Sequence, residues 1–411
     1  MAVPIVPFFA HRPNCIILNP YINYILSFTT ALLAYLVGWS DMYPPATATL
    51  LIFLGLTFLA HGWLAYRWKL TVSVVTEEPL LFKPVSVTLF IYLLWGLDFL
   101  YEGGIPILKI LFGQPYNYRQ FGFPSVHVFT VTFASFYTVY LLGLFLSTRK
   151  RIYLILYVIN LAAALLIYSR AMLLFNLFAS FQVWLFYTGG ISRLQWAGLF
   201  VGMVVLAYGF GWMGSKRVSF ENGKSYDPSL FLNIGEATSG FRNSIVPPEF
   251  FWSYVYLSSP LANFQQNLNT YPVPKPTPGL WARMINNEML PDFISKRINR
   301  IFSTGRSDEH AIPGKPFNVS TVYSRSYCYL GWTGLVVMGL FVACVPLLYA
   351  YLLPENSYSF AGLAILNTMY FFLFYDNTIR FTGLSLQLAY PFLLPVGEWL
   401  YRRLVHPKLI A

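Results

Sequence analysis

Apolar runs of close to twenty residues recur along the chain, and short polar turns separate them. A helix that crosses a membrane needs about 20 mostly apolar residues. Ten segments meet or approach this requirement, the ninth being short, and we expect them to be membrane-spanning helices: residues 21–39, 47–66, 85–102, 125–147, 152–168, 171–187, 194–213, 329–352, 360–374 and 381–400. The pattern therefore predicts an all-α polytopic membrane protein.

Two stretches break this series. Residues 103–124 contain Pro106, Gly113, Pro115 and Gly122 among aromatic residues, a density of helix breakers that favours a re-entrant or interfacial loop. Residues 214–326 are polar and far longer than most connections, which indicates a functional or disordered segment.

The longer stretch is not expected to be a simple linker. It carries an aromatic-rich run at residues 250–256, which a solvated linker would lack. We predict a partly helical cap on the outer face. The chain then divides into a first bundle of seven spans (1–213), a large loop (214–326) and a second bundle of three spans (327–411).

Composition agrees with a membrane setting. The chain is 56% hydrophobic and 10% charged, whereas soluble domains carry about 25% charged residues. Its formal net charge of +11 has to be interpreted by position, because basic residues beside spans set orientation. Nucleic acid is therefore not an expected partner, and the lipid bilayer is.

The basic residues predict an orientation. If ten spans alternate, one side receives most of the Lys and Arg in the short loops, which favours the cytoplasm for that side. These residues are Arg12, Arg67, Lys69, Lys83, Arg149, Lys150, Arg151, Arg193, Arg402, Arg403 and Lys408. Both termini are then cytoplasmic. Residues 103–124, Arg170, residues 214–326 and Arg380 lie on the outer face.

Arginines at the outer ends of spans are the first candidates for chemistry. Arg170 and Arg380 each occupy such an end, where an unpaired charge is costly. One interpretation is that each arginine extends to the lipid headgroups. The other is a clamp, because guanidinium stays charged and recognises phosphate through two parallel hydrogen bonds. A lipid-linked pyrophosphate would need such a clamp.

Several residues are candidate proton acceptors. His127 opens the fourth span, and its near-neutral pKa suits proton transfer, although a single histidine is also a common structural residue. Asp308, Glu309 and His310 are adjacent, and they form either a general base or an exposed turn.

A pair of carboxylates in the third span is open to two interpretations as well. Asp98 and Glu102 are four residues apart on one helical face, which would suit an acid and base pair. Since Glu102 is near the membrane interface, we favour solvated carboxylates.

Other chemistries lack their motifs. The sequence has no GxxxxGK[ST] loop, no GxGxxG after a predicted strand, no HExxH and no GxSxG. Cys15, Cys328 and Cys344 are odd in number and lack metal-ligand spacing, so we expect core or lipid-facing positions for them. No metal and no cofactor is predicted.

Four runs together resemble the Wzy-type oligosaccharide repeat unit polymerases, which are relatives of the O-antigen ligases. The runs are YNYRQFGFPSVH (116–127), YSRAMLL (168–174), YVYLSSPLANFQQNLNTY (254–271) and NVSTVYSRSYCYLGWTG (318–334). They cover both halves of the chain in the order typical of that family. The chain departs from the last pattern, because Leu330 stands before Gly331 where the family usually has Asp.

The resemblance implies a lipid-donor glycosyltransferase with a GT-C-like architecture in the bacterial inner membrane. Its large loop would be periplasmic. The enzyme would transfer a glycan from undecaprenyl pyrophosphate to another lipid-linked repeat without a metal.

The resemblance also implies roles for single residues. Arg170, Arg325 and Arg380 would bind the pyrophosphate and stabilise its departure. Asn263 would orient a sugar hydroxyl or cap a loop helix. The further candidates for substrate binding are Arg242, Arg283, Arg306 and Tyr323. Such enzymes commonly work with a chain-length regulator protein.

Three other classes remain open. An O-antigen ligase would use the same donor but transfer the glycan to lipid A core. A polysaccharide flippase would line several spans with polar or charged residues, and the few charges within the apolar segments speak against it. A membrane scaffold would tolerate loss of the three arginines.

Overall fold

The computed structural model of the chain describes residues 18–68, 83–112, 121–188, 191–221, 225–302 and 318–405. Within these ranges the chain is helical, and the only extended pairing is an isolated antiparallel bridge between Ser40 and Ala237. The predicted all-helical class is therefore confirmed for the described part of the chain.

Eight helices build the first part of the chain. They are α1 (Pro20–Val37), α2 (Ala48–Arg67), α3 (Pro84–Tyr101), α4 (Pro106–Leu111), α5 (Val126–Thr148), α6 (Arg151–Leu166), α7 (Arg170–Thr188) and α8 (Arg193–Glu221). Local capping fixes the first ends: Asn19 Oδ1 accepts from Tyr21 N at 3.0 Å, and Pro20 fits the first turn, where its missing N–H is not needed. Thr47 caps α2 in the same way.

Six short or medium elements follow in the region of the predicted cap. They are α9 (Ser229–Ile234), α10 (Ser239–Arg242), α11 (Phe250–Thr270), α12 (Pro278–Met284), the π-helical turn η2 (Ile285–Met289) and α13 (Asp292–Phe302). The region has an aromatic core, in which Phe231 and Trp252 stack with ring centres 3.5 Å apart. It is folded, and α11 packs against both α1 and α8.

The last part contains α14 (Ser324–Leu352), α15 (Ser359–Phe372), α16 (Thr382–Ser385), the 3₁₀ turn η4 (Leu386–Ala389) and α17 (Tyr390–Val405). α14 is bent at Gly331, whose φ of 58° and ψ of −137° are not helical. The seven residues before the bend, 324–330, therefore run in a different direction from the apolar remainder of the helix.

Seven described helices are long and apolar enough to cross a membrane: α1, α2, α3, α5, α7, α8 and α14. Two further apolar helices, α6 and α15, are shorter. The chain is thus a polytopic helical membrane protein by length and composition. The expected span at 381–400 is not one helix, because α16 and η4 occupy its first half and α17 runs on to Val405.

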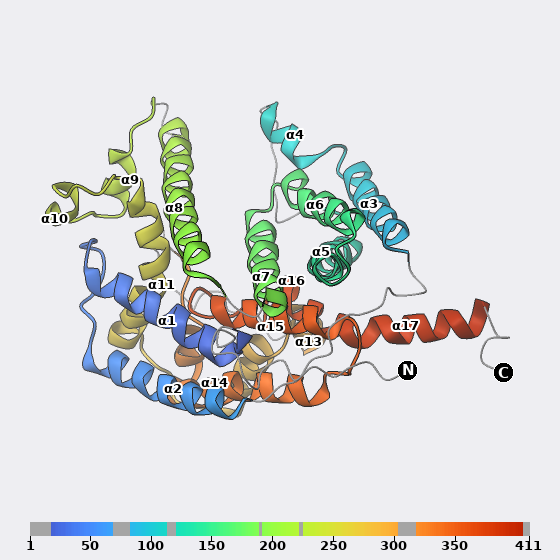
Figure 1. Cartoon of the computed structure of the whole chain (residues 1–411). Coiled ribbons are helices and arrows are strands. Elements are labelled where there is room, and N and C mark those ends of the chain that lie inside the picture. The colour runs from blue at the N-terminus through green and yellow to red at the C-terminus, as the bar shows by residue number, and fades with distance from the viewer. Residues whose placement is uncertain are drawn as a thin grey trace.

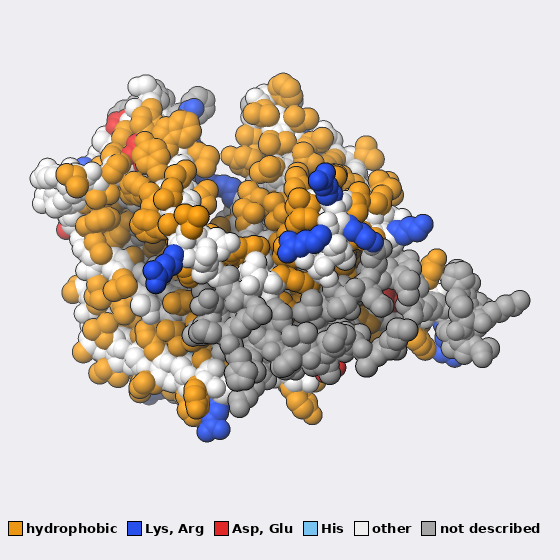
Figure 2. All heavy atoms as spheres, in the orientation of Figure 1, with side chains coloured by type: hydrophobic (Ala, Val, Ile, Leu, Met, Phe, Trp, Pro, Cys, Tyr) orange, Lys and Arg blue, Asp and Glu red, His pale blue; other side chains and the backbone are white. Residues whose placement is uncertain are grey.

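The helices form two groups that meet at α7 and α15 (Figure 1). α1 packs against α2, α11 and α15, while α5 packs against α3, α6 and α7. α7 and α15 pack against each other and join the groups through Phe178 and Phe371, whose ring centres are 4.3 Å apart. Hydrophobic side chains cover much of the described part of the face shown in Figure 2, as expected for a surface in contact with lipid.

Candidate functional site

A cluster of charged and amide side chains lies where the cap meets the end of α15. We define the Glu288 cluster as Glu288, Asp292, Asn377 and Arg380. The Glu288 side chain is 2% exposed, and its Oε1 lies 3.3 Å from Arg380 Nη1. Arg380 Nε lies 3.4 Å from Asp292 Oδ1. One guanidinium therefore bridges two carboxylates that come from different elements.

Backbone geometry explains why these groups meet. Glu288 lies in the π-helical turn η2, and π-turns often occur at functional sites because the wider turn redirects side chains. Asn377 Nδ2 donates to the Glu288 backbone oxygen at 2.7 Å, and Asp292 N donates to Arg380 O at 2.8 Å. The segment 376–382 is thereby tied to the cap at several points.

Burial and charge act in opposite directions on Glu288. Removal from water raises the pKa of its carboxyl group, because the charged form loses hydration. The positive charges of Arg380 and Arg325 and the hydrogen bond from Asn377 lower this pKa, whereas the charge of Asp376 raises it. The net effect is a raised pKa, so burial dominates.

Arg325 belongs to the same site. It lies before the bend of α14 and is half-buried, and its charge acts on Glu288. Two of the arginines predicted to bind pyrophosphate thus surround one buried carboxylate. Glu288, Asp292, Arg325 and Arg380 together carry equal numbers of acidic and basic groups, so an incoming anion has to compete with carboxylates already present.

Arg170 lies at the edge of this region. It is exposed at the start of α7, and its charge acts on Tyr375, which is next to Asp376. Burial raises the pKa of the Tyr375 hydroxyl, and the charge of Arg170 opposes this effect. The 375–380 segment is therefore the feature that connects Arg170 with Arg325 and Arg380.

Four other predicted site residues have separate surroundings. Arg242 donates from Nε to Ala237 O at 2.8 Å and from Nη2 to Leu232 O at 3.0 Å, so it closes the end of α9. Asn263 Nδ2 donates to Val319 O at 2.7 Å and joins α11 to the segment before α14. Tyr323 is fully buried, and its hydroxyl lies 2.8 Å from that of Tyr24. Arg283 is exposed on α12.

The structure assigns packing roles to three of these four. Arg242 and Asn263 hold cap segments in place, and Tyr323 lies in the core rather than at the Glu288 cluster. Arg306, Asp308, Glu309 and His310 lie outside the described residues.

His127 forms a second polar group with α3. Its Nδ1 lies 2.8 Å from Asp98 Oδ2, and Asp98 is fully buried. Phe123 N donates to Asp98 Oδ1 and Gly122 N donates to Glu102 Oε1, each at 2.9 Å. The expectation of solvated carboxylates was wrong for Asp98, which is fully buried, whereas Glu102 is half-buried. Both accept hydrogen bonds from the turn before α5. Asp98 orients His127 and fixes this turn.

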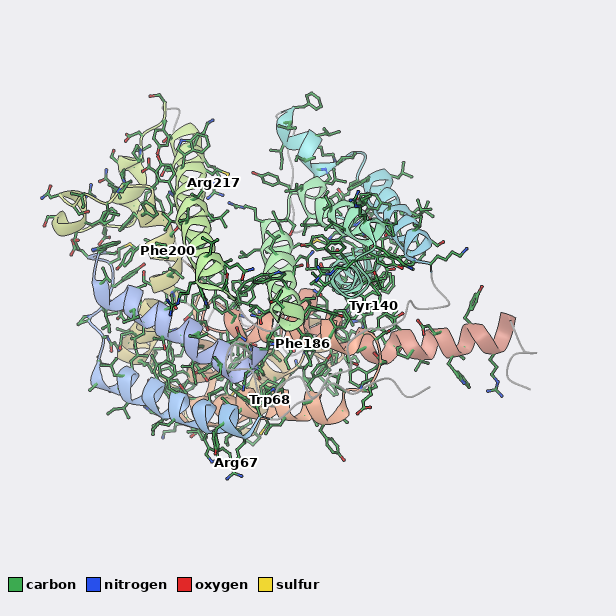
Figure 3. All side chains as sticks on the ribbon, in the orientation of Figure 1. Arg67, Trp68, Tyr140, Phe186, Phe200 and Arg217 are labelled. Carbon is green, nitrogen blue, oxygen red and sulfur yellow. The ribbon has the colours of Figure 1, made fainter. Side chains whose placement is uncertain are left out.

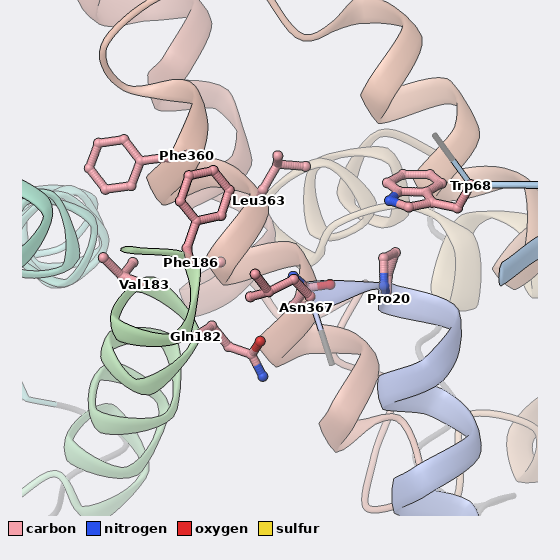
Figure 4. Close-up of a pocket in the computed structure, with 10 residues that line it drawn as sticks. Pro20, Trp68, Gln182, Val183, Phe186, Phe360, Leu363 and Asn367 are labelled. Atoms are coloured by element: carbon pink, nitrogen blue, oxygen red, sulfur yellow. The ribbon is translucent and has the colours of Figure 1, made fainter. Parts of the chain in front are cut away.

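A polar region also lies within the bundle, between α1, α7 and α15 (Figure 4). Gln182 Nε2 donates to Asn23 Oδ1 at 3.2 Å. Gln182 Oε1 and Asn367 Oδ1 are buried and accept no hydrogen bond within the part of the chain that the structure describes. Both residues line a small pocket with Leu18, Pro20, Trp68, Val183, Phe186, Phe360, Leu363 and Ala364.

Sequence reasoning missed Glu288, Asp292 and Asn377. One signal was available: the polar run Asn286, Asn287, Glu288 has Met284 and Ile285 before it and Met289 and Leu290 after it. A polar trio enclosed by apolar residues indicates a buried hydrogen-bonded site. Asn286 and Asn287 are indeed buried and bonded to Asn299 at 2.8 and 2.9 Å.

The fold and this cluster define a class, a polytopic helical membrane protein with a folded polar cap. Among the described residues no group of three His, Cys, Asp or Glu has the arrangement of a metal site. Comparison with protein families, curated proteins and solved structures finds no match to the chain.

Proposed function

We propose that the chain polymerises lipid-linked oligosaccharide repeats, transferring a growing glycan from undecaprenyl pyrophosphate to another lipid-linked repeat at the outer face of the bacterial inner membrane. The observation that supports this most directly is the approach of Arg325 and Arg380 to one partly enclosed region, with Arg170 at its edge. A pyrophosphate leaving group needs charge neutralisation, which guanidinium groups supply.

The sequence resemblance supplies the substrate class in this proposal, and the cluster supplies the chemistry. Arg380 is held by Glu288 and Asp292, so its guanidinium is oriented before an anion arrives. His127 is oriented by Asp98. Among the candidate bases it is the one that lies in the described part of the chain, and it would accept the proton of the acceptor hydroxyl.

The test is an assay for glycan ladders with the purified protein and a defined lipid-linked repeat. Arg325→Ala and Arg170→Ala are the informative variants, because neither arginine has a carboxylate within salt-bridge distance among the described contacts. We expect each to lose long chains while the substrate remains as single repeats. The matched control is Arg67→Ala, at the end of α2, where the side chain projects outward (Figure 3). Normal ladders from Arg325→Ala and Arg170→Ala would contradict the proposal.

Arg380 needs a different variant. Removing it alone leaves two carboxylates without their cation, and breaking a buried pair costs about 3–5 kcal/mol. The double variant Arg380→Gln with Glu288→Gln removes both buried charges together. If this double variant folds, loss of ladders is due to the missing cation and not to unfolding.

Transfer of the same glycan to lipid A core, as in an O-antigen ligase, would use the same cluster. Mass analysis of the product distinguishes the two acceptors, since a polymerase yields repeats linked to repeats.

The pocket in Figure 4 supports a second candidate, a polysaccharide flippase. Polar side chains from α1, α7 and α15 meet within the bundle, and two of their oxygens lack donors among the described residues. A transport route requires polar groups at this depth. The test is movement of a fluorescent lipid-linked oligosaccharide across vesicles that contain the protein, compared with Gln182→Leu. Movement that is fast in the wild type and slow in the variant would favour transport over polymerisation.

A further inference from the structure

α13 has an unusual surface for a helix in the cap. Its eleven residues carry exposed cations and exposed apolar side chains together. Lys296, Arg297 and Arg300 are exposed, and Ile301 and Phe302 are 73% and 70% exposed. A helix in contact with water alone would not present this much apolar surface.

Helical spacing sorts these residues into stripes. Ile294, Ile298 and Ile301 are four and three residues apart, so they lie on one side of the helix. Lys296 and Arg300 are four residues apart and lie on a neighbouring side, with Arg297 between the two stripes.

The third side of α13 is held by protein. Ser295 is buried, and Asn299 exchanges hydrogen bonds with Asn286 and Asn287 of η2 at 2.8 and 2.9 Å. At the start of the helix, Phe293 N donates to Thr382 Oγ1 at 3.1 Å. The helix is thus anchored through one side, and its apolar and basic stripes face away from that anchor.

We propose that α13 lies in the membrane interface, with its isoleucine stripe among the acyl chains and its basic stripe on anionic lipid headgroups. An amphipathic helix with Lys and Arg beside a stripe of large apolar residues binds in this way. Each basic residue close to an anionic surface strengthens the contact by roughly fivefold. The inference needs only that the chain is embedded in a membrane, and it is independent of the polymerase activity.

The position of α13 gives this contact a consequence. Asp292, its first residue, bonds to Arg380 through both backbone and side chain. A helix seated on headgroups would hold the Glu288 cluster at the level where a lipid-linked anion is presented.

Nitroxide labelling tests the proposal. The full chain, with Cys15→Ala, Cys328→Ala and Cys344→Ala, receives one label at Ile301→Cys or at Lys296→Cys. It is reconstituted in nanodiscs of phosphatidylcholine or of phosphatidylcholine mixed with phosphatidylglycerol. In the anionic nanodiscs we expect the label at 301 to collide several-fold more with oxygen than with a water-soluble nickel complex. The label at 296 should show the reverse preference.

The charge requirement has its own control. With Lys296→Gln, Arg297→Gln and Arg300→Gln, the label at 301 should become accessible to the nickel complex, as it should in phosphatidylcholine alone. Equal access of nickel to positions 301 and 296 in anionic nanodiscs would overturn the proposal. So would a label at 301 that neither reagent reaches, because protein rather than lipid would then cover the stripe.

Discussion

At the scale of single residues, Glu288 is the group on which the candidate site depends most. Its side chain is almost fully buried. Arg380 and Asn377, which both lie in the segment after α15, contact its carboxylate. Ionised groups are buried only where partners replace the lost hydration. Arg380 and Asn377 are those partners.

The raised pKa of Glu288 predicts a pH dependence of stability. The folded state binds this proton more tightly than the unfolded state does. The associated stability is therefore complete below the ordinary pKa of 4.5 and is lost as pH rises through the raised value. In the wild type, the midpoint of thermal unfolding should therefore decrease as the pH rises above 4.5. In Glu288→Gln this decrease should be smaller. Glu355→Gln, at an exposed position before α15, is the control, and an unchanged decline in Glu288→Gln would refute the assignment.

We expect loss of the Asp292 carboxylate to strengthen anion binding, whereas loss of an arginine should weaken it. Its carboxylate competes with any phosphate for Arg380, and its side chain is 16% exposed, so it can be displaced. Asp292→Asn should tighten binding of inorganic pyrophosphate by about two- to fivefold, which corresponds to a partly exposed ion pair. Calorimetry of the purified protein measures this.

The control for Asp292→Asn is Asp41→Asn, in the exposed turn between α1 and α2. Binding that is unchanged or weaker in Asp292→Asn would show that this carboxylate does not compete for the anion.

Sequence reasoning found part of this site for a physical reason. Arg170 and Arg380 were identifiable because a charge at the end of an apolar span is costly, whereas Arg325 was named through the family resemblance. The carboxylate partner of Arg380 was not identifiable, since Glu288 is separated from Arg380 by 92 residues and only folding brings them together. Asp98 was misjudged because its partners, Phe123 N and His127 Nδ1, lie 25 and 29 residues further along the chain, and only folding brings them to α3.

At the scale of elements, the bend in α14 decides where Arg325 lies. A helix continuing straight through Gly331 would carry residues 324–330 along the span axis. The bend lets Tyr329 and Leu330 pack with Met284 of α12. This apolar contact holds the start of α14 beside η2 and therefore beside Glu288.

Gly331→Ala should destabilise this arrangement. The backbone angles at Gly331 are close to a region that is almost confined to glycine, and a side chain there costs about 1–3 kcal/mol. A Cβ atom would also lie 2.9 Å from Val273 Cγ1. We expect a lower midpoint of thermal unfolding, whereas Gly339→Ala, later in α14 with open space around it, should have little effect. Equal midpoints for both variants would show that the bend carries no strain.

The long helices were predicted well where an uninterrupted apolar segment was long enough to span a membrane. α1, α2, α5 and α14 lie within a few residues of the expected spans or extend them at one end. The segment 381–400 differs because its apolar residues are interrupted: α16 and η4 precede Tyr390, and Pro391 suits the first turn of a new helix. Hydropathy alone does not register such a break.

At the scale of the whole molecule, the function depends on which side of the membrane receives the cap. The distribution of Lys and Arg predicts cytoplasmic termini and an outer cap. An outer cap has access to lipid-linked pyrophosphates after they have crossed the membrane. A cytoplasmic cap would leave the Glu288 cluster on the wrong side for the proposed reaction.

Cysteine labelling decides between the two orientations. In a chain with Cys15→Ala, Cys328→Ala and Cys344→Ala, Lys275→Cys reports on the exposed segment between α11 and α12, and Lys150→Cys reports on the opposite, basic side. We expect a membrane-impermeant maleimide to label position 275 in intact cells and position 150 only after permeabilisation. The positions are controls for each other, because each must react once the membrane is open. The reverse pattern would place the arginines in the cytoplasm, and it would remove the basis for a reaction at the outer face while leaving the helical fold unaffected.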